Sequence, residues 1–273
     1  MIGGEPFRTE LLAGKTAFIA GGTSGINLGI AQAFARAGAR VGVAGRNADK
    51  AAAAVAILRA EGAQALGQSM DVRAYDAVER ALHETHDRLG PIDIVISGAA
   101  GNFLAPASGM SSNAFRTVID IDLIGTFNVF RASHRFLNAP GASLIAISAG
   151  QAVSPVMHQS HVCAAKAGIN MLVKVLAMEW GPSGIRVNAI SPGPISETEG
   201  MARLTPTAAD KAAWTQKIAL RRFGEKADVA NMAMFLASHS SNYVTGAIFD
   251  CDGGWTLGDS SGAIPAPATE KAR

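Results

Sequence analysis

Two charged residues stand in segments that are otherwise apolar. Lys166 lies at the centre of the run AAKAG, and Asp122 lies in the run VIDIDLIG. Burying a charge is costly unless the charge is paired or used in a reaction, so each residue is a candidate for function. Lys166 is the natural partner of Asp122, and such a pair could relay a proton through water. Asp120 and Asp122 are two positions apart, so on a helix at most one of them faces a site.

His161 is the third candidate for catalysis, five residues before Lys166. A histidine titrates near neutral pH and can carry a proton, although a histidine with satisfied hydrogen bonds inside a core is an equally common alternative. The two cysteines, Cys163 and Cys251, are far apart and lack the spacing of metal ligands. The sequence therefore predicts acid–base chemistry without a metal.

A glycine-rich turn, AGGTSGINLG, follows the first apolar run. Glycines let a backbone turn tightly and approach a pyrophosphate, and the helix that follows offers free N–H groups and the positive end of its dipole. An ordinary strand-to-helix turn is the alternative. The position between the first strand and the first helix favours a dinucleotide site. Its expected contacts are Gly21, Thr23, Ser24, Gly25 and Ile26.

The end of the second strand indicates which dinucleotide is bound. Sites specific for NAD place an acidic residue there to hold the ribose 2′-hydroxyl, whereas this strand ends Ala44-Gly45-Arg46. Arg46 can pair with a 2′-phosphate through two hydrogen bonds, although a solvated loop arginine is the alternative. Asp71 and Val72, after the third strand, are placed to contact the adenine. We therefore expect NADP(H) as the cofactor.

Apolar runs of strand length alternate with amphipathic runs along the chain. This alternation predicts an α/β fold, a single Rossmann-type doubly wound parallel sheet of about seven strands with helices on both faces. The expected strands are 16–20, 40–44, 65–69, 92–97, 143–148, 185–190 and 247–250, and the expected helices are 26–37, 49–61, 75–89, 113–137, 160–180 and 228–237. We expect one domain over 1–258, a substrate lid near 192–220, and a loosely ordered tail over 259–273.

Composition excludes several classes of protein. Of 273 residues 48% are apolar and the net charge is +2 without a long basic run, so nucleic acid is not an expected partner. No stretch approaches the length of a membrane span, and no signal peptide is recognisable at the start of the sequence. The sequence ends Lys271-Ala272-Arg273 rather than in a peroxisomal S-K-L signal. These features predict a cytoplasmic protein with a small-molecule substrate.

Several short motifs resemble those of the short-chain dehydrogenase/reductase family. Ser97–Gly101 (SGAAG) stands at the family's Asn-Asn-Ala-Gly motif, Asp122–Gly125 (DLIG) at its Asn-x-x-Gly motif, and Lys166 at the Lys of its Tyr-x-x-x-Lys motif. Pro192-Gly193 matches the turn beside the nicotinamide, and Asp252–Gly254 matches the C-terminal signature. The resemblance covers nearly the whole chain.

The departures from the family pattern concern the catalytic positions. Val162 stands at the Tyr, Ala149 at the Ser, and Asp122 at the Asn, while Asn27 replaces the third glycine of the turn. Alcohol dehydrogenation needs the Tyr to exchange a proton with the alcohol oxygen, and Val cannot do this.

One branch of the family lacks this Tyr, and the sequence resembles its peroxisomal-type 2,4-dienoyl-CoA reductases. The runs AAGNF, GTFNV and PGPI carry the resemblance, and Gln151 stands where the mitochondrial type has a Tyr. The resemblance implies NADPH, a fatty acyl-CoA substrate and a homotetramer. It implies a cofactor site that includes Ala99, Ala100, Lys166, Pro192, Gly193 and Ile195. It also implies a substrate site of Asn102, Phe103, Arg116, Gln151, Ser196 and Met201.

Two other functions stay open on the sequence alone. The first is a carbonyl reductase of 3-oxoacyl substrates that uses Asp122, His161 or water in place of the Tyr. The second is a catalytically silent Rossmann protein that binds NADP(H). The missing Tyr and Ser favour a silent protein, whereas the retained Lys166 and Asp122 favour an enzyme.

Overall fold

Seven parallel strands form one sheet at the centre of the protein. The computed structural model describes residues 7 and 10–262, so the part of the predicted tail over 263–273 lies outside the described residues. The strand order is β3-β2-β1-β4-β5-β6-β7 and every pairing is parallel. The strands are β1 Thr16–Ala20, β2 Arg40–Gly45, β3 Ala65–Ser69, β4 Ile94–Ser97, β5 Ser143–Ile147, β6 Arg186–Pro192 and β7 Ile248–Cys251.

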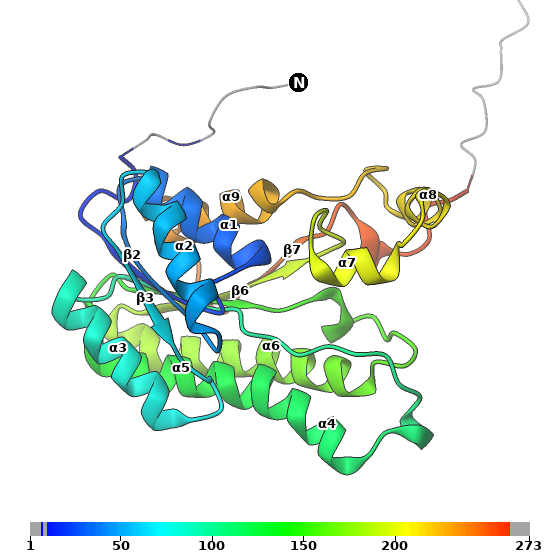
Figure 1. The fold of residues 1–273 in the computed structure, drawn as a ribbon, viewed down its shortest axis with the longest axis horizontal. Coiled ribbons are helices and arrows are strands. Elements are labelled where there is room, and N and C mark those ends of the chain that lie inside the picture. Colours follow the sequence, from blue (N-terminus) through cyan, green and yellow to red (C-terminus); the bar gives the residue numbers. More distant parts are fainter. Residues whose placement is uncertain (1–6, 8–9, 263–273) are drawn as a thin grey trace, which may run out of the picture.

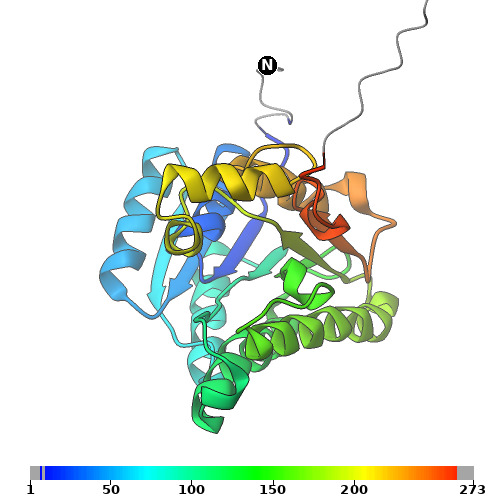
Figure 2. The ribbon, with the colours of Figure 1, turned by 90° about the vertical axis from the view of Figure 1, so that its right-hand side faces the viewer.

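Helices cover both faces of the sheet, which confirms the predicted fold class (Figure 1). One layer holds α1 Gly25–Arg36, α2 Ala48–Ala60 and α9 Lys226–Ala237. The other holds α3 Tyr75–Leu89, α4 Ser112–Ile119, α5 Gly125–Ser133 and α6 Ser160–Trp180. Two further helices, α7 Glu199–Leu204 and α8 Ala208–Lys217, lie beyond the carboxyl ends of the strands (Figures 1 and 2).

The alternation of side chains along each strand fills both layers. In β1, Ile19 packs into the core beneath α1 and α9, whereas its neighbour Phe18 packs into the core beneath α3 and α5. Both side chains are 0% exposed. Successive residues of a strand point to opposite faces, so a strand covered by helices on both sides must be apolar throughout. This is why the strands could be recognised as continuous apolar runs.

The long helix expected over 113–137 is wrong as a single element. It consists of α4, a π-helical turn at Asp120–Ile124, α5, and a 3₁₀ turn at His134–Phe136. The strand ends also shift by one or two residues. Ile92 forms only an isolated bridge with Leu137, and β6 continues to Pro192. A π turn holds one extra residue and changes the direction in which the following side chains point.

Helix α6 is more apolar than we expected from the sequence. The stretch Ser160–Ser183 is long and apolar enough to cross a membrane by length and composition, with a mean hydropathy of 1.3. It nevertheless packs on β6, and 44% of it is buried inside the fold. A helix that packs on a doubly wound sheet has this composition because one of its faces is buried against the sheet and must be apolar.

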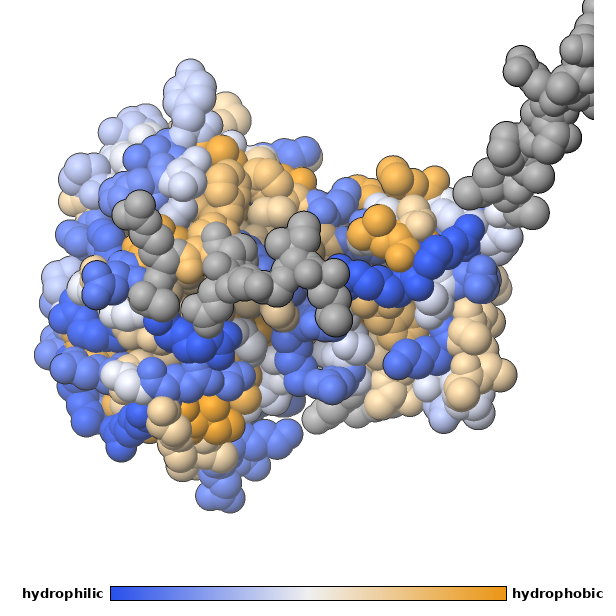
Figure 3. Space-filling view, turned by 90° about the horizontal axis from the view of Figure 1, so that it is seen from above, coloured by the Kyte–Doolittle hydropathy of each residue, from blue (hydrophilic) through white to orange (hydrophobic). Residues whose placement is uncertain are grey.

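The strand order reverses between β1 and β4, where the chain crosses from one side of the sheet to the other. Ligands of open α/β sheets bind at such a switch point, beyond the carboxyl ends of the strands. The segment predicted as a lid, 192–220, carries α7 and α8 above this edge. Seen from above, the segment with α7 and α8 projects beyond the layer of α1, α2 and α9 (Figure 3). The surface of that helix layer mixes hydrophilic and hydrophobic residues.

Candidate active site

A cavity of about 670 Å³ opens at the switch point. The loops that follow β1 to β6 form its walls, together with α6, α7 and α8. Of the residues predicted to bind cofactor or substrate, those lining the cavity are Gly21, Thr23, Ser24, Gly25, Ile26, Arg46, Asp71, Val72, Ala99, Ala100, Asn102, Gln151, Lys166, Pro192, Gly193 and Met201.

The glycine-rich turn has the shape of a phosphate cradle. Gly21 and Gly25 adopt positive φ angles of 79° and 59°, which residues with a side chain rarely adopt. A Cβ on Gly21 would lie 2.7 Å from the amide nitrogen of Ala99, whereas a Cβ on Gly25 would enter open space. The side chain of Ser24, at the N-cap of α1, accepts no hydrogen bond from the first turn of the helix. The first N–H groups of α1 are thus available to an anionic ligand, and this turn fits a pyrophosphate.

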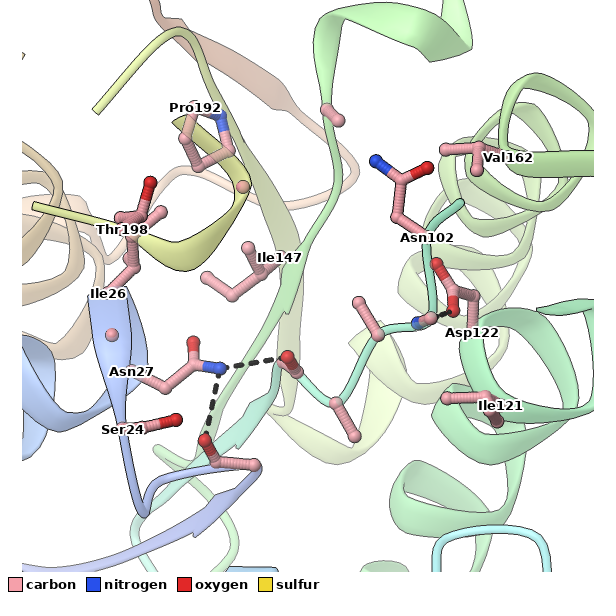
Figure 4. Close-up of a pocket in the computed structure, with 18 of the residues that line it drawn as sticks. Ser24, Ile26, Asn27, Asn102, Ile121, Asp122, Ile147, Val162, Pro192 and Thr198 are labelled. Carbon is pink, nitrogen blue, oxygen red and sulfur yellow. Dashed lines mark hydrogen bonds between the residues drawn. The ribbon is translucent and has the colours of Figure 1, made fainter. Parts of the chain in front are cut away.

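Asn27 supports the turn from below. Its Nδ2 donates to the carbonyl oxygens of Gly98 at 2.8 Å and Gly21 at 3.3 Å (Figure 4). In the sequence, Asn27 stands out only as a departure from the glycine pattern. In the structure it joins the loop after β1 to the loop after β4.

The far end of the cavity carries positive charge. Arg46 is exposed at the rim beside Asn47, whose side chain caps α2 by accepting from the Lys50 N–H. Asp71 makes a bidentate ion pair with Arg73, with 2.6 Å between Asp71 Oδ2 and Arg73 Nη2. The Arg73 hydrogen bond lowers the pKa of Asp71, and the charge of Arg46 lowers it further. Asp71 is therefore neutralised by Arg73, and Arg46 remains available to a phosphate.

Lys166 and Asp122 meet at the opposite end. Asp122 comes from the π turn, and its Oδ2 lies 3.3 Å from Nζ of Lys166. Asp122 Oδ1 accepts the Gly101 N–H at 2.7 Å (Figure 4), and Lys166 Nζ donates to the Ile147 carbonyl at 3.0 Å. Asp122 is 0% exposed. The pair thus has one hydrogen bond on each side, and Asp122 Oδ2 has no hydrogen bond of good geometry within the described residues.

His161 lies behind this pair rather than on the cavity wall. It is 0% exposed, and its ring centroid is 4.2 Å from that of Phe103. Neither ring nitrogen makes a hydrogen bond of good geometry with the described part of the chain. Burial lowers the pKa of His161, and the Phe103 carbonyl and the Asp122 carboxylate oppose that shift only in part. The imidazole is therefore kept neutral close to the buried carboxylate.

Three side-chain amides form a chain beside the pair. Gln151 Nε2 donates to Gln159 Oε1 at 3.1 Å, and Gln159 Nε2 donates to Asn102 Oδ1 at 3.2 Å. Gln159 is only 2% exposed, although it is polar and stands at the N-cap of α6. Sequence reasoning missed Gln159, because nothing in the run MHQSHV separates it from a loop residue.

Besides His161, four predicted site residues do not line the cavity. Arg116 is exposed on α4, and Phe103 lies against His161. Ile195 forms a backbone bridge with Gly224 that turns its side chain into the core, and the Ser196 N–H donates to the Gly224 carbonyl. Conversely, several lining residues were not predicted as site residues: Asn27, Thr198, Leu204, Trp214 and Trp255. Trp214 and Trp255 stack with their ring centroids 6.0 Å apart.

The cavity contains no phenol. Val162 and Ala149 line it where the family places Tyr and Ser. The chain has two tyrosines, Tyr75 and Tyr243, and in the part that the structure describes neither reaches this wall. Tyr75 accepts from Arg131, and Tyr243 is fully exposed. No metal-binding cluster of His, Cys, Asp or Glu occurs among residues 7 and 10–262. At the end of the cavity next to Val162, the ionisable groups on the described wall are thus Lys166 and Asp122, with His161 behind them.

Comparison with known proteins gives relatives over most of the chain. Residues 20–256 match the family model described as enoyl-(acyl carrier protein) reductase. The chain is 42% identical over 250 residues to the peroxisomal 2,4-dienoyl-CoA reductase of Danio rerio, covering 91% of this chain and 83% of that protein. It is 40% identical over 263 residues to the Arabidopsis thaliana protein of the same name, covering 93% and 88%. Both names specify a (3E)-enoyl-CoA product.

Among solved structures, a short-chain type dehydrogenase/reductase from Mycobacterium ulcerans superposes with a TM-score of 0.87. It is 33% identical, and the match covers 91% of this chain and 92% of that one.

The comparisons also correct the expected location. The relatives from fish, plant, mammals and yeast are named peroxisomal, which contradicts the cytoplasmic location expected from the sequence. Two free thiols do not identify a compartment.

Proposed function

The chain belongs to the short-chain dehydrogenase/reductase family of oxidoreductases, and on that premise we propose that it reduces 2,4-dienoyl thioesters of coenzyme A with NADPH. One observation carries the proposal. The cavity retains the buried Lys166–Asp122 pair but has Val162 and Ala149 where an alcohol would need a phenol and a hydroxyl. Such a site suits a reaction that makes no alcohol. The names of the relatives support the substrate.

The cavity fits a nicotinamide dinucleotide along its length. The cradle at Gly21 and Gly25 would hold the pyrophosphate, and Lys166 would bind the nicotinamide ribose. When bound, the cofactor supplies a hydride to the δ-carbon of the dienoyl thioester. Arg46 supports NADPH over NADH, because a guanidinium pairs well with a 2′-phosphate and the position directly after β2 is Arg46 rather than an acidic residue.

Negative charge then develops on the thioester oxygen of the substrate, and this oxygen needs a donor. We assign this role to Asn102. In Figure 4 the side-chain nitrogen of Asn102 faces the open middle of the cavity, and its oxygen faces Val162. The oxygen is already occupied by Gln159 Nε2, which leaves the Nδ2 hydrogens for the substrate.

The resulting dienolate is protonated on carbon. Protonation at the α-carbon leaves one double bond between the β- and γ-carbons, the 3-enoyl product named for the relatives. The ammonium group of Lys166 would supply this proton, and the Asp122 carboxylate would hold Lys166 in position. His161, kept neutral by burial behind Asp122, would return a proton to the pair. One hydride and one proton are consumed for each product molecule.

Steady-state assays test the proposal. NADPH oxidation is followed with a 2,4-dienoyl-CoA and with a 3-oxoacyl-CoA, and NADP⁺ reduction is followed with a secondary alcohol. We expect turnover with the dienoyl-CoA alone, and a reaction in D₂O should place one deuterium on the α-carbon. Preference for the 3-oxoacyl-CoA would establish a carbonyl reductase instead. Tight NADPH binding without any turnover would establish a silent dinucleotide-binding protein.

We also infer a homo-oligomer, and the family resemblance implies a tetramer. Exposed apolar side chains on α6 support an interface, because large apolar patches on a monomer mark contacts with other molecules. Met171, Val175 and Met178 on α6 are 61%, 41% and 79% exposed. Light scattering should give a multiple of the 28.1 kDa chain, and Met178→Glu should lower it.

A further inference from the structure

Gln159 is buried and polar, and the reaction described above does not use it directly. Its side chain is 2% exposed and makes two hydrogen bonds, both with other side-chain amides. It stands at the N-cap of α6, the helix that carries Lys166, and its backbone carbonyl accepts the Cys163 N–H at 2.9 Å. A second link ties the same segment to the loop after β4, since the Ala105 N–H donates to the His158 carbonyl at 3.0 Å. Gln159 is thus fixed at both its backbone and its side chain.

An amide presents a different group at each end, so the direction of an amide chain has a chemical consequence. Gln159 accepts from Gln151 through Oε1 and therefore has its Nε2 hydrogens for Asn102. Because Asn102 Oδ1 accepts from Gln159, Asn102 Nδ2 is turned to the cavity (Figure 4). The reverse direction would present Oδ1 to the cavity and repel a negatively charged oxygen.

We propose that Gln159 is a positioning residue that selects the donor orientation of the Asn102 amide toward the thioester oxygen. This inference rests on the proposed function and adds a residue that touches neither substrate nor cofactor. Gln159 holds the donor in place before the reaction, so that little reorientation is needed when charge develops. Preorganised donors of this kind account for a large share of catalysis.

The decisive variant is Gln159→Glu. A carboxylate cannot donate to Asn102 Oδ1 but can accept from Asn102 Nδ2, so it reverses the Asn102 amide at almost unchanged volume. Removing one donor to a developing oxyanion costs about 10²–10³-fold in kcat, and we expect a loss of this order in kcat at pH 8. The Kd for NADPH should stay within about twofold, because no cofactor contact changes. Gln64→Glu is the matched control, since Gln64 is exposed and remote from the cavity.

Lowering the pH provides a readout that a purely structural residue would not give. A protonated carboxyl group donates again, and burial raises the pKa of a carboxyl group into an accessible range. The kcat of Gln159→Glu relative to wild type should therefore recover as the pH falls from 8 to 5. A ratio that is constant over this range would overturn the inference.

A double-mutant cycle tests whether Gln159 acts through Asn102. Asn102→Ala should itself lower kcat, and adding Gln159→Glu to it should change kcat by less than about threefold. Equal losses in both backgrounds would overturn the inference.

If thermal unfolding shows that Gln159→Glu does not fold, the neutral Gln159→Met enters the same cycle with the same expectation. Wild-type enzyme inactive on dienoyl-CoA would overturn the proposed function together with this inference, whereas an active wild type with an unaffected Gln159→Glu would overturn the inference alone.

Discussion

The Nδ2 group of Asn27 donates a hydrogen bond of 2.8 Å to the carbonyl oxygen of Gly98, 71 positions along the chain. The bond joins the turn after β1 to the loop after β4, on the two sides of the switch point. The contact is close enough to restrict Gly98 to glycine, because a Cβ there would lie 2.3 Å from Asn27 Oδ1. Asn27 and Gly98 therefore depend on each other, and together they shape the floor of the cofactor cavity.

This dependence predicts an unusual pair of variants. Gly98→Ala should destabilise the protein by about 1–3 kcal/mol and weaken NADPH binding, because the new methyl group overlaps Asn27. The double variant Asn27→Gly/Gly98→Ala removes the overlapping side chain and should regain part of that loss. Thermal unfolding and NADPH titration measure both effects. Additive losses in the double variant would show that the two residues do not interact in this way.

A second prediction concerns the choice of dinucleotide. Arg46→Ala should raise the Kd for NADPH by about 10–100-fold, since a charge-assisted bidentate hydrogen bond contributes roughly 1.5–3 kcal/mol. The Kd for NADH should barely change, because NADH has no 2′-phosphate. Arg80→Ala, an exposed arginine on α3, is the control. Similar affinities of the wild type for NADPH and NADH would contradict the specificity proposed for Arg46.

A third prediction follows from the lowered pKa of His161. In the unfolded chain this histidine takes up a proton as the pH falls through its ordinary value of about 6.5, whereas in the folded protein it stays neutral to lower pH. Below about pH 6.5 the unfolded state therefore binds more protons than the folded state. This proton uptake stabilises the unfolded state, so the free energy of unfolding decreases as the pH falls. The contribution is at most about 1.4 kcal/mol per pH unit.

Unfolding measured from pH 7 to pH 5 checks this prediction. His161→Leu should flatten the loss of stability on acidification, whereas His239→Gln, at an exposed site, should follow the wild type. Parallel curves for wild type and His161→Leu would mean that His161 gains its proton equally in both states. Its proposed place as a neutral proton carrier behind Asp122 would then lose its physical basis.

The sequence predicted the sheet well because buried parallel strands must be apolar on both faces, and this pattern survives without knowledge of the partners. It predicted the cofactor half of the cavity for a related reason. Gly21, Gly25 and Arg46 occupy a local strand–turn–helix unit, so their placement depends on nearby residues only. Elements of this kind are specified by short runs of sequence.

The other half of the cavity depends on contacts between distant segments. The π turn that carries Asp122 breaks a helix whose apolar periodicity looked continuous. The chain through Gln159 joins the loops after β4 and β5, and no local pattern marks it. Ile195 was misplaced because its bridge to Gly224 decides which way the side chain faces. Side-chain direction at loops is set by partners that only the folded chain brings together.

A fourth prediction concerns Lys166. Lys166→Ala should abolish turnover and weaken NADPH binding, because Lys166 both contacts Asp122 and faces the expected nicotinamide ribose. It also leaves Asp122 as a buried carboxylate without its cation, which should lower stability by about 3–5 kcal/mol. Lys174→Ala, an exposed lysine on the same helix, is the control. Near-normal kcat in Lys166→Ala would place the chemistry elsewhere.

The last prediction separates two functions of Asp122. Its carboxylate anchors the loop after β4 by accepting the Gly101 N–H, and it also faces Lys166. Asp122→Asn retains an acceptor for Gly101 and restores the family's residue, yet it removes the charge that holds the Lys166 ammonium. If the charge serves proton transfer, Asp122→Asn should fold and bind NADPH normally while kcat falls about 10²–10⁴-fold, the usual loss for a general acid or its partner. Asp122→Ala should lose NADPH affinity as well, because the anchor is gone. Full activity in Asp122→Asn would reduce Asp122 to an anchor.

Adding the missing phenol should not substitute for this pair. Val162→Tyr lacks a hydroxyl at Ala149 to bind an alcohol oxygen, so oxidation of a secondary alcohol with NADP⁺ should stay undetectable in it. Alcohol oxidation by wild type or by Val162→Tyr at a rate comparable to dienoyl reduction would show that the cavity was built for a carbonyl and not for a conjugated thioester.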